Sequence, residues 1–169
     1  MYELLKLFFD ICLFKKGPED IPVSMGLLYF LLPIYACTSF LILILNTDVT
    51  NAILQIGIEI VLILGFCRII LYLAKKTERY VQTACAIVAT DSIISFFAIP
   101  VMGSLLVEGS ALSFFSIVLL MLWQWNISGF IFAKALGQSF TFGLGVSFLY
   151  ILISYQLMAI FFPEIIVME

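Results

Sequence analysis

Five long apolar segments, separated by short polar turns, constrain the fold of this 169-residue chain more than any other feature. Each is long enough to cross a bilayer core, which takes about 20 helical residues. The chain is 64% hydrophobic and 11% charged, whereas about 45–50% and about 25% are usual for soluble domains. We therefore predict an all-α polytopic membrane bundle. Its transmembrane helices are expected at about 24–45, 52–74, 80–107, 111–133 and 139–162.

We expect residues 1–23 to form a cytoplasmic amphipathic arm before the predicted 24–169 bundle. Apolar residues recur at three- and four-residue spacing over residues 1–14, with charged residues between them, which predicts an amphipathic helix. We expect this helix to lie in the cytoplasmic membrane interface. Extension into the cytosol and docking on a partner are the alternatives. The segment GPEDIPVS, residues 17–24, ends the helix through its prolines, and Ser24 is a candidate cap for the first span.

The basic residues predict how the chain is oriented in the membrane. All but one of them fall in the arm, the second turn or the fourth turn, while the first turn, the third turn and the C-terminal tail have none. Basic residues close to a span are retained on the cytoplasmic side. We therefore expect a cytoplasmic N-terminus and an outward-facing C-terminus at Glu169. The basic residues are Lys6, Lys15, Lys16, Lys75, Lys76, Arg79 and Lys134, with Arg68 as the exception.

Three ionisable residues, Glu59, Arg68 and Asp91, lie inside predicted spans. Each costs about 2.5–3.5 kcal/mol near the bilayer centre, so each needs a structural or functional reason. Asp91 is expected near mid-membrane, and Arg68 on the adjacent antiparallel span is the nearest cation. We predict an ion pair between them, although Arg68 could instead extend to the lipid headgroups. Glu59 should point away from Arg68, and we favour a hydrogen-bonded group joining helices over a proton or cation site.

Span four carries two amides, Gln124 and Asn126, near its middle. Such side chains form hydrogen bonds between membrane helices, and either could meet Asp91. A polar substrate site at the midplane is the alternative. Span five carries small residues at four-residue spacing, a pattern that lets a second helix approach closely. These residues are Ser139, Gly143 and Ser147.

No pattern typical of an enzyme, a cofactor site or a metal site is visible in the sequence. Histidine is absent, and the four cysteines lie in separate apolar segments without CxxC spacing. The net charge of −3 argues against a nucleic-acid partner. We expect a non-catalytic structural, scaffolding or assembly subunit, with the lipid bilayer and either other membrane subunits or a second copy as partners. The alternative is a small oligomeric transporter or channel that uses intramembrane carboxylates. Five spans cannot form two equal inverted halves, so such a pathway would need oligomerisation.

The chain resembles the Yip1-like membrane proteins. The resemblance rests on a cytoplasmic N-terminus, five closely spaced spans and no large domain outside the membrane. The arm ending in GPEDIPVS also looks like short inner-membrane proteins of proteobacteria, which implies a bacterial inner-membrane location. The long cytoplasmic N-terminal region of the eukaryotic members is missing. Their trafficking role is therefore not implied, and no site residues carry over.

Overall fold

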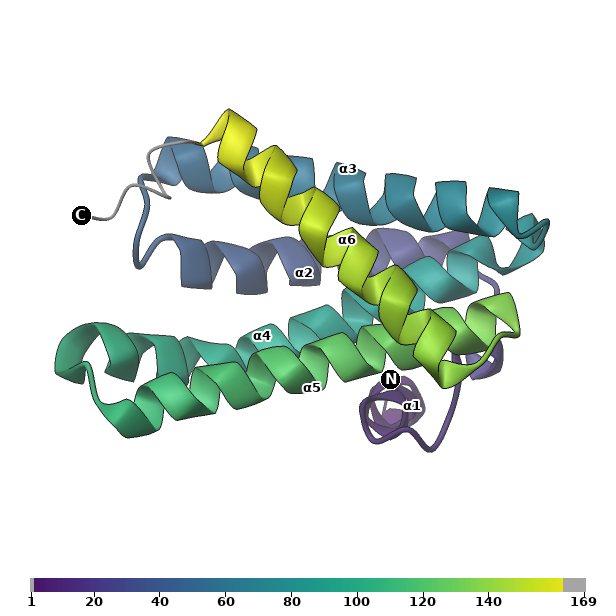
Figure 1. The fold of residues 1–169 in the computed structure, drawn as a ribbon, viewed down its shortest axis with the longest axis horizontal. Helices are drawn as coiled ribbons and strands as arrows, with labels where there is room; N and C mark the ends of the chain where they lie inside the picture. The colour runs from purple at the N-terminus through teal and green to yellow at the C-terminus, as the bar shows by residue number, and fades with distance from the viewer. Residues whose placement is uncertain (1, 163–169) are drawn as a thin grey trace.

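The computed structural model describes residues 2–162, and the elements in this range are helices (Figure 1). Five of them, α2 to α6, are long and apolar enough to cross a membrane. The predicted fold class, an all-α bundle of an integral membrane protein, is therefore confirmed. The predicted outward position of Glu169 lies outside the described residues. The elements are α1 (Tyr2–Cys12), η1 (Pro18–Asp20), α2 (Met25–Leu43), α3 (Val49–Leu73), η2 (Thr77–Arg79), α4 (Tyr80–Glu108), α5 (Ala111–Leu136) and α6 (Phe140–Phe161).

Serine and glycine residues set several of the helix ends. Ser24 caps α2 as predicted, because its side chain accepts a hydrogen bond from the backbone N–H of Leu27. Ser110 caps α5 in the same way. Helices α4 and α5 end at Gly109 and Gly137, whose φ angles of 57° and 61° lie in the left-handed region that favours glycine. These local signals make the connections short, so consecutive long helices run antiparallel.

The bundle is tightly packed in one half and loosely packed in the other. On α4, the residues of 81–90 are buried except for the half-buried Gln82, whereas residues 95–108 contain no fully buried side chain among those described. Small residues such as Ala84 and Ala86 let α2 and α5 approach α4 closely in the first half. On α5, Ile127 and Ile131 belong to this packed half and are fully buried. The second half is therefore where space remains between the helices.

Helix α6 rests on α5 through glycine residues and crosses the bundle diagonally (Figure 1). A Cβ atom at Gly143 would collide with the carbonyl oxygen of Gly129 and come within 2.7 Å of Ala133. Ser147 is fully buried, and its hydroxyl donates to the Trp125 carbonyl over 3.4 Å. Two residues of the predicted small-residue stripe thus face α5 of the same chain.

The third residue predicted in the stripe, Ser139, does not pack between helices. It is exposed and caps α6, its side chain accepting from the Phe142 N–H. The four-residue spacing includes Ser139 only if the helix continues through it. Gly137 ends α5 immediately before this point, so Ser139 belongs to the turn.

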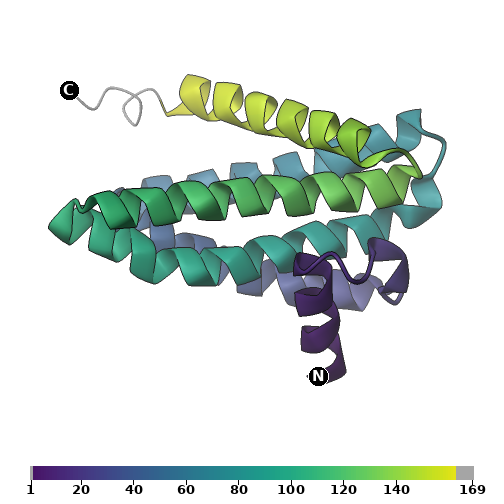
Figure 2. The same ribbon diagram turned by 60° about the horizontal axis from the view of Figure 1, so that its bottom comes forward.

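The amphipathic helix α1 packs against the bundle and runs across its long axis (Figure 2). Its buried face consists of Leu7, Phe8, Ile11 and Cys12. The indole N–H of Trp123, midway along α5, donates to the Cys12 carbonyl over 3.1 Å. Burial raises the pKa of the Cys12 thiol to about 12, so this thiol remains neutral and packs as an apolar group. Part of the apolar surface of α1 is therefore covered by the protein's own helices, while Leu5 and Phe9 stay exposed. The membrane interface stays the predicted location of this helix.

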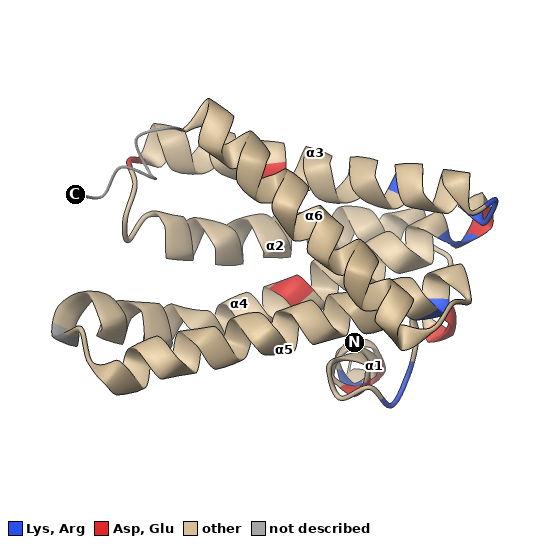
Figure 3. Ribbon diagram, in the orientation of Figure 1, with Lys and Arg blue, Asp and Glu red and all other residues tan. Residues whose placement is uncertain are grey.

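Basic residues gather at the end of the bundle where α3 meets α4 and α5 meets α6, here called the basic end (Figure 3). The Lys76 ammonium donates to the Leu136 carbonyl over 2.7 Å. The Arg79 guanidinium donates to the Lys134 carbonyl over 3.2 Å. These carbonyls lie at the C-terminus of α5, where cations complement the helix dipole. The contacts fasten the α3–α4 turn to the end of α5.

Candidate functional site

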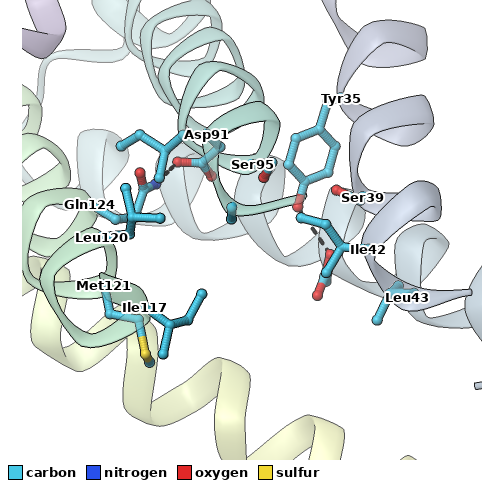
Figure 4. A pocket seen from close by; sticks show the side chains of 13 residues that line it. Tyr35, Ser39, Ile42, Leu43, Asp91, Ser95, Ile117, Leu120, Met121 and Gln124 are labelled. Carbon is cyan, nitrogen blue, oxygen red and sulfur yellow. Dashed lines mark hydrogen bonds between the residues drawn. The ribbon is translucent and has the colours of Figure 1, made fainter. Parts of the chain in front are cut away.

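A partly open cavity of about 290 Å³ lies among α2, α3, α4 and α5 in the loosely packed half of the bundle (Figure 4). Its wall extends to Leu43, the last residue of α2, and to Ile117 in the second turn of α5. The cavity therefore reaches from the middle of the bundle toward the end opposite the basic end. The polar residues that line it are Tyr35, Ser39, Glu59, Asp91, Ser95 and Gln124.

Helical spacing brings these polar groups to one place. Tyr35 and Ser39 are four residues apart on α2, and Asp91 and Ser95 are four residues apart on α4. Side chains four residues apart share one face of a helix. The two polar faces meet the same cavity, and Gln124 of α5 completes its polar wall. Most of the remaining lining is aliphatic.

The first carboxyl group joins α2 to α3. The Tyr35 hydroxyl donates a hydrogen bond to Glu59 Oε2 over 3.0 Å. The Tyr35 side chain is only 6% exposed, so its hydroxyl needs a partner inside the bundle. This contact is a hydrogen bond between helices, as we predicted for Glu59. Glu59 also lines the cavity, so the same side chain is available to a ligand.

The second carboxyl group joins α4 to α5. The Gln124 amide nitrogen donates to Asp91 Oδ1, and Figure 4 shows this pair across the cavity from Tyr35. The Gln124 amide oxygen is buried and has no hydrogen-bond partner among residues 2–162. An unpartnered buried acceptor is uncommon and calls for an explanation. A donor from a bound molecule or a water molecule would satisfy it.

The predicted ion pair between Arg68 and Asp91 is wrong. Within the described chain the one salt bridge joins Lys134 to Glu19 over 3.9 Å. Arg68 is exposed, and its guanidinium carbon lies 6.0 Å from the centre of the Tyr80 ring. Tyr80 begins α4, eleven residues before Asp91, which is about 16 Å along the helix. Arg68 is therefore directed toward the basic end and away from the cavity.

The cavity wall contains two carboxyl groups and no lysine or arginine. A carboxylate that ionises here has no protein cation in the cavity wall to pair with. No group of three potential ligands among His, Cys, Asp and Glu is placed to hold a metal ion in the part of the chain that the structure describes. Glu59 and Asp91 instead belong to hydrogen-bonded pairs on different helices.

Asn126 does not meet Asp91, although we predicted that it could. Its amide nitrogen donates to the Leu122 carbonyl of its own helix over 2.7 Å. Asn126 is two residues from Gln124, about 200° around the helix, so it points to another side. The tryptophans beside these amides contact other segments of the chain. Trp123 bonds to the end of α1, and the Trp125 indole donates to the Leu144 carbonyl of α6 over 3.2 Å.

The sequence interpretation did not single out Tyr35, Ser39 or Ser95 as site residues. A usable signal was present in the four-residue spacing of the polar pairs on α2 and α4. Polar residues repeated at this spacing in an apolar span mark a face that avoids lipid. Which helix each face meets depends on the packing of the bundle, which spacing within one helix does not specify.

The position of Arg68 leads to a testable expectation. Arg68→Ala and Asp91→Asn should change the free energy of unfolding independently, because the two side chains contact different residues. The measurement is a double-mutant cycle on protein in detergent micelles. We expect the sum of the single effects to match the double variant within about 0.5 kcal/mol. A coupling free energy well above this value would show that Arg68 and Asp91 do interact, and would contradict the described positions.

Comparisons with known proteins identify no relative: no protein-family model, curated protein or solved structure matches the chain. The functional argument therefore rests on the cavity and its residues.

Proposed function

We propose that the protein is a non-catalytic small transporter or channel that binds a monovalent cation through intramembrane carboxyl groups. The observation that carries this proposal is the cavity shared by Glu59 and Asp91 without a basic residue in its wall. Ionisable groups inside membrane bundles are costly and commonly serve substrate or ion pathways. The cavity favours this function over the purely structural role that the sequence alone favours.

The size and the lining of the cavity favour one class of cation. Its volume of about 290 Å³ is close to the lower end of small-molecule sites, about 300–1,000 Å³. Its wall combines aliphatic side chains with the Tyr35 ring and two carboxyl groups on different sides. An organic ammonium ion would use the aliphatic wall and the carboxyl groups, since its alkyl groups suit apolar surroundings and its charge suits carboxylates. Sodium, potassium and the proton are the smaller alternatives.

Passage to the other side would require a change in the tightly packed half. Buried residues such as Val88 and Ile131 fill the bundle between the cavity and the basic end. In this proposal the described conformation receives the cation from the end where α2 and α4 terminate. Separation of α4 from α5 in the packed half, or assembly of several copies, would complete the pathway.

The membrane setting is part of the proposal. The basic end carries Lys75, Lys76, Arg79 and Lys134, so we place it on the cytoplasmic side. The cavity then faces outward, with the N-terminus in the cytoplasm and the C-terminus outside. We further propose a bacterial inner-membrane location and a relation to the Yip1-like proteins, on the resemblance in topology alone.

Cation flux into proteoliposomes tests the proposal. The reconstituted protein should carry tetramethylammonium, sodium, potassium or protons, and Glu59→Gln should abolish that flux. Glutamine keeps the size of the side chain and can still accept from Tyr35, but it carries no charge. Glu78→Gln is the matched control, because Glu78 is an exposed residue of the α3–α4 turn. Absence of flux with every cation, or equal loss in both variants, would contradict the proposal.

A structural subunit of a larger membrane complex remains the second candidate. One observation favours it: each intramembrane carboxyl group already accepts a hydrogen bond from a neutral donor on a neighbouring helix. Under this function Glu59→Gln should leave the recovery of an assembled complex unchanged, while Glu59→Leu should lower it. Purification in mild detergent with mass spectrometry of co-migrating proteins measures this. Stoichiometric partners together with no cation flux would favour the structural subunit.

A further inference from the structure

A second cavity, of about 420 Å³, lies at the basic end and is separate from the carboxylate-lined cavity. It is formed by the last turns of α3 and the first turns of α6, with the α5–α6 turn between them. We call it the Lys76 groove. Its main lining residues are Ile70, Leu73, Leu136, Phe142, Val146 and Lys76. The groove is thus an apolar slot with one positive charge and no acidic residue in its wall.

The charge in the groove is joined to the end of α5 by a hydrogen bond. The Lys76 side chain is half-buried, and one of its N–H groups donates to the Leu136 carbonyl over 2.7 Å. A Cβ atom at Gly137 would come within 2.6 Å of the ammonium nitrogen. The left-handed turn, with φ of 61°, is what requires glycine here, since the tip of the lysine side chain can move aside from an added Cβ.

The ammonium group keeps binding capacity for a ligand. It carries three N–H donors, and it makes no further hydrogen bond or salt bridge to residues 2–162. A lysine so placed, facing an apolar slot at the end of transmembrane helices, complements a molecule with an anionic head and a hydrocarbon tail. Basic pockets between membrane helices bind the head groups of anionic lipids.

We propose that the Lys76 groove binds an anionic phospholipid. The phosphate accepts hydrogen bonds from the Lys76 ammonium, and one acyl chain lies along Ile70, Phe142 and Val146. The site is independent of the cation cavity, so it stands whether or not the protein carries cations. The bound lipid would fill the space between α3 and α6 at this end.

Native mass spectrometry tests this inference on purified protein. The protein in mild detergent is given equal amounts of phosphatidylglycerol and phosphatidylcholine with identical acyl chains. We expect the wild type to retain phosphatidylglycerol preferentially, and Lys76→Gln to reduce this preference about five-fold or more. Lys76→Arg should retain it. Lys75→Gln is the matched control, because Lys75 is exposed and does not line the groove.

Two further measurements distinguish a lipid site from a simple phosphate site. Val146→Trp should fill the groove and lower the retention of both lipids, with thermal melting used to show that the variant is folded. If it unfolds, Leu73→Trp at an exposed position of the wall replaces it. Inorganic phosphate should not displace the bound lipid. Retained preference in Lys76→Gln, equal loss in Lys75→Gln, or displacement by phosphate would overturn the inference.

Discussion

Gly143→Ala should be among the most damaging single-methyl changes in this protein. The added Cβ would collide with the Gly129 carbonyl oxygen and crowd Ala133, and both belong to the regular helix α5. Backbone atoms of a helix cannot move aside as a flexible side chain can, so α6 must shift away from α5. Overpacking of this kind costs about 1–3 kcal/mol. The measurement is the midpoint of thermal unfolding in detergent, together with the yield of monodisperse protein.

Gly145→Ala provides the matched control for this prediction. Gly145 lies on the same helix two residues later, is exposed, and has no atom within 4 Å of an added Cβ. Alanine favours the helix over glycine by up to about 1 kcal/mol, so this variant should be as stable as the wild type or more so. Similar midpoints for the two variants would show that α5 and α6 do not approach as closely as described.

The second large effect concerns the pair formed by Asp91 and Gln124. Asp91→Leu removes the acceptor of the Gln124 amide nitrogen, while the Gln124 amide oxygen already lacks a partner in the described chain. Leaving a buried polar group unpaired costs about 1–3 kcal/mol. Gln124→Leu should cost at least as much, because it strands a carboxyl group. Equilibrium unfolding in mixed micelles measures both effects.

The double variant Asp91→Leu/Gln124→Leu gives this prediction its sharpest form. Replacement of both partners by apolar groups leaves no unpaired polar atom and can be nearly neutral for stability. We therefore expect the double variant to be more stable than either single variant. Asn126→Leu serves as a control, since Asn126 bonds only within its own helix. A double variant with the summed loss of the two single variants would show that the side chains do not interact.

The sequence predicts the helices well because their signals are local. Apolar length identifies each span, and Ser24, Gly109 and Gly137 mark helix ends through the conformations and hydrogen bonds they favour. The main error among these local predictions concerns Ser139. This residue caps α6, but its spacing matches the small-residue stripe within that helix. Local patterns thus define elements, but they do not separate the last residue of a turn from the first residue of a packing face.

The candidate site is predicted only in part, because it depends on how the helices are rotated and paired. Glu59, Asp91 and Gln124 attract notice as costly or polar groups in apolar spans. Charge alone pairs Asp91 with Arg68, although the packing directs Arg68 toward Tyr80 instead. Likewise, the contact of Tyr35 with Glu59 depends on the rotation of α2 against α3, which no pattern within either helix specifies.

The N-terminal arm is a further case in which the pattern within a helix does not specify what the helix packs against. Its amphipathic pattern predicts the helix α1 correctly, but the pattern is the same whether the apolar face meets lipid or protein. The contacts of Ile11 and of the Cys12 carbonyl show that one part of this face meets the bundle, while Leu5 and Phe9 stay exposed. An amphipathic helix presents the same apolar stripe to a lipid surface and to a protein surface, so the stripe alone does not identify its neighbour.

The most direct test of the central claim, that the carboxylate-lined cavity receives a cation, is protection from dicyclohexylcarbodiimide, an apolar reagent for carboxyl groups. Purified protein is treated with and without tetramethylammonium, and mass spectrometry locates the modified residues. A neutral compound of the same size is the control, and sodium forms a separate arm. We predict modification at Glu59 and Asp91, slowed by the cation at both positions and unaffected by the neutral compound. Equal modification with and without any cation, or equal protection by the neutral compound, would contradict the claim.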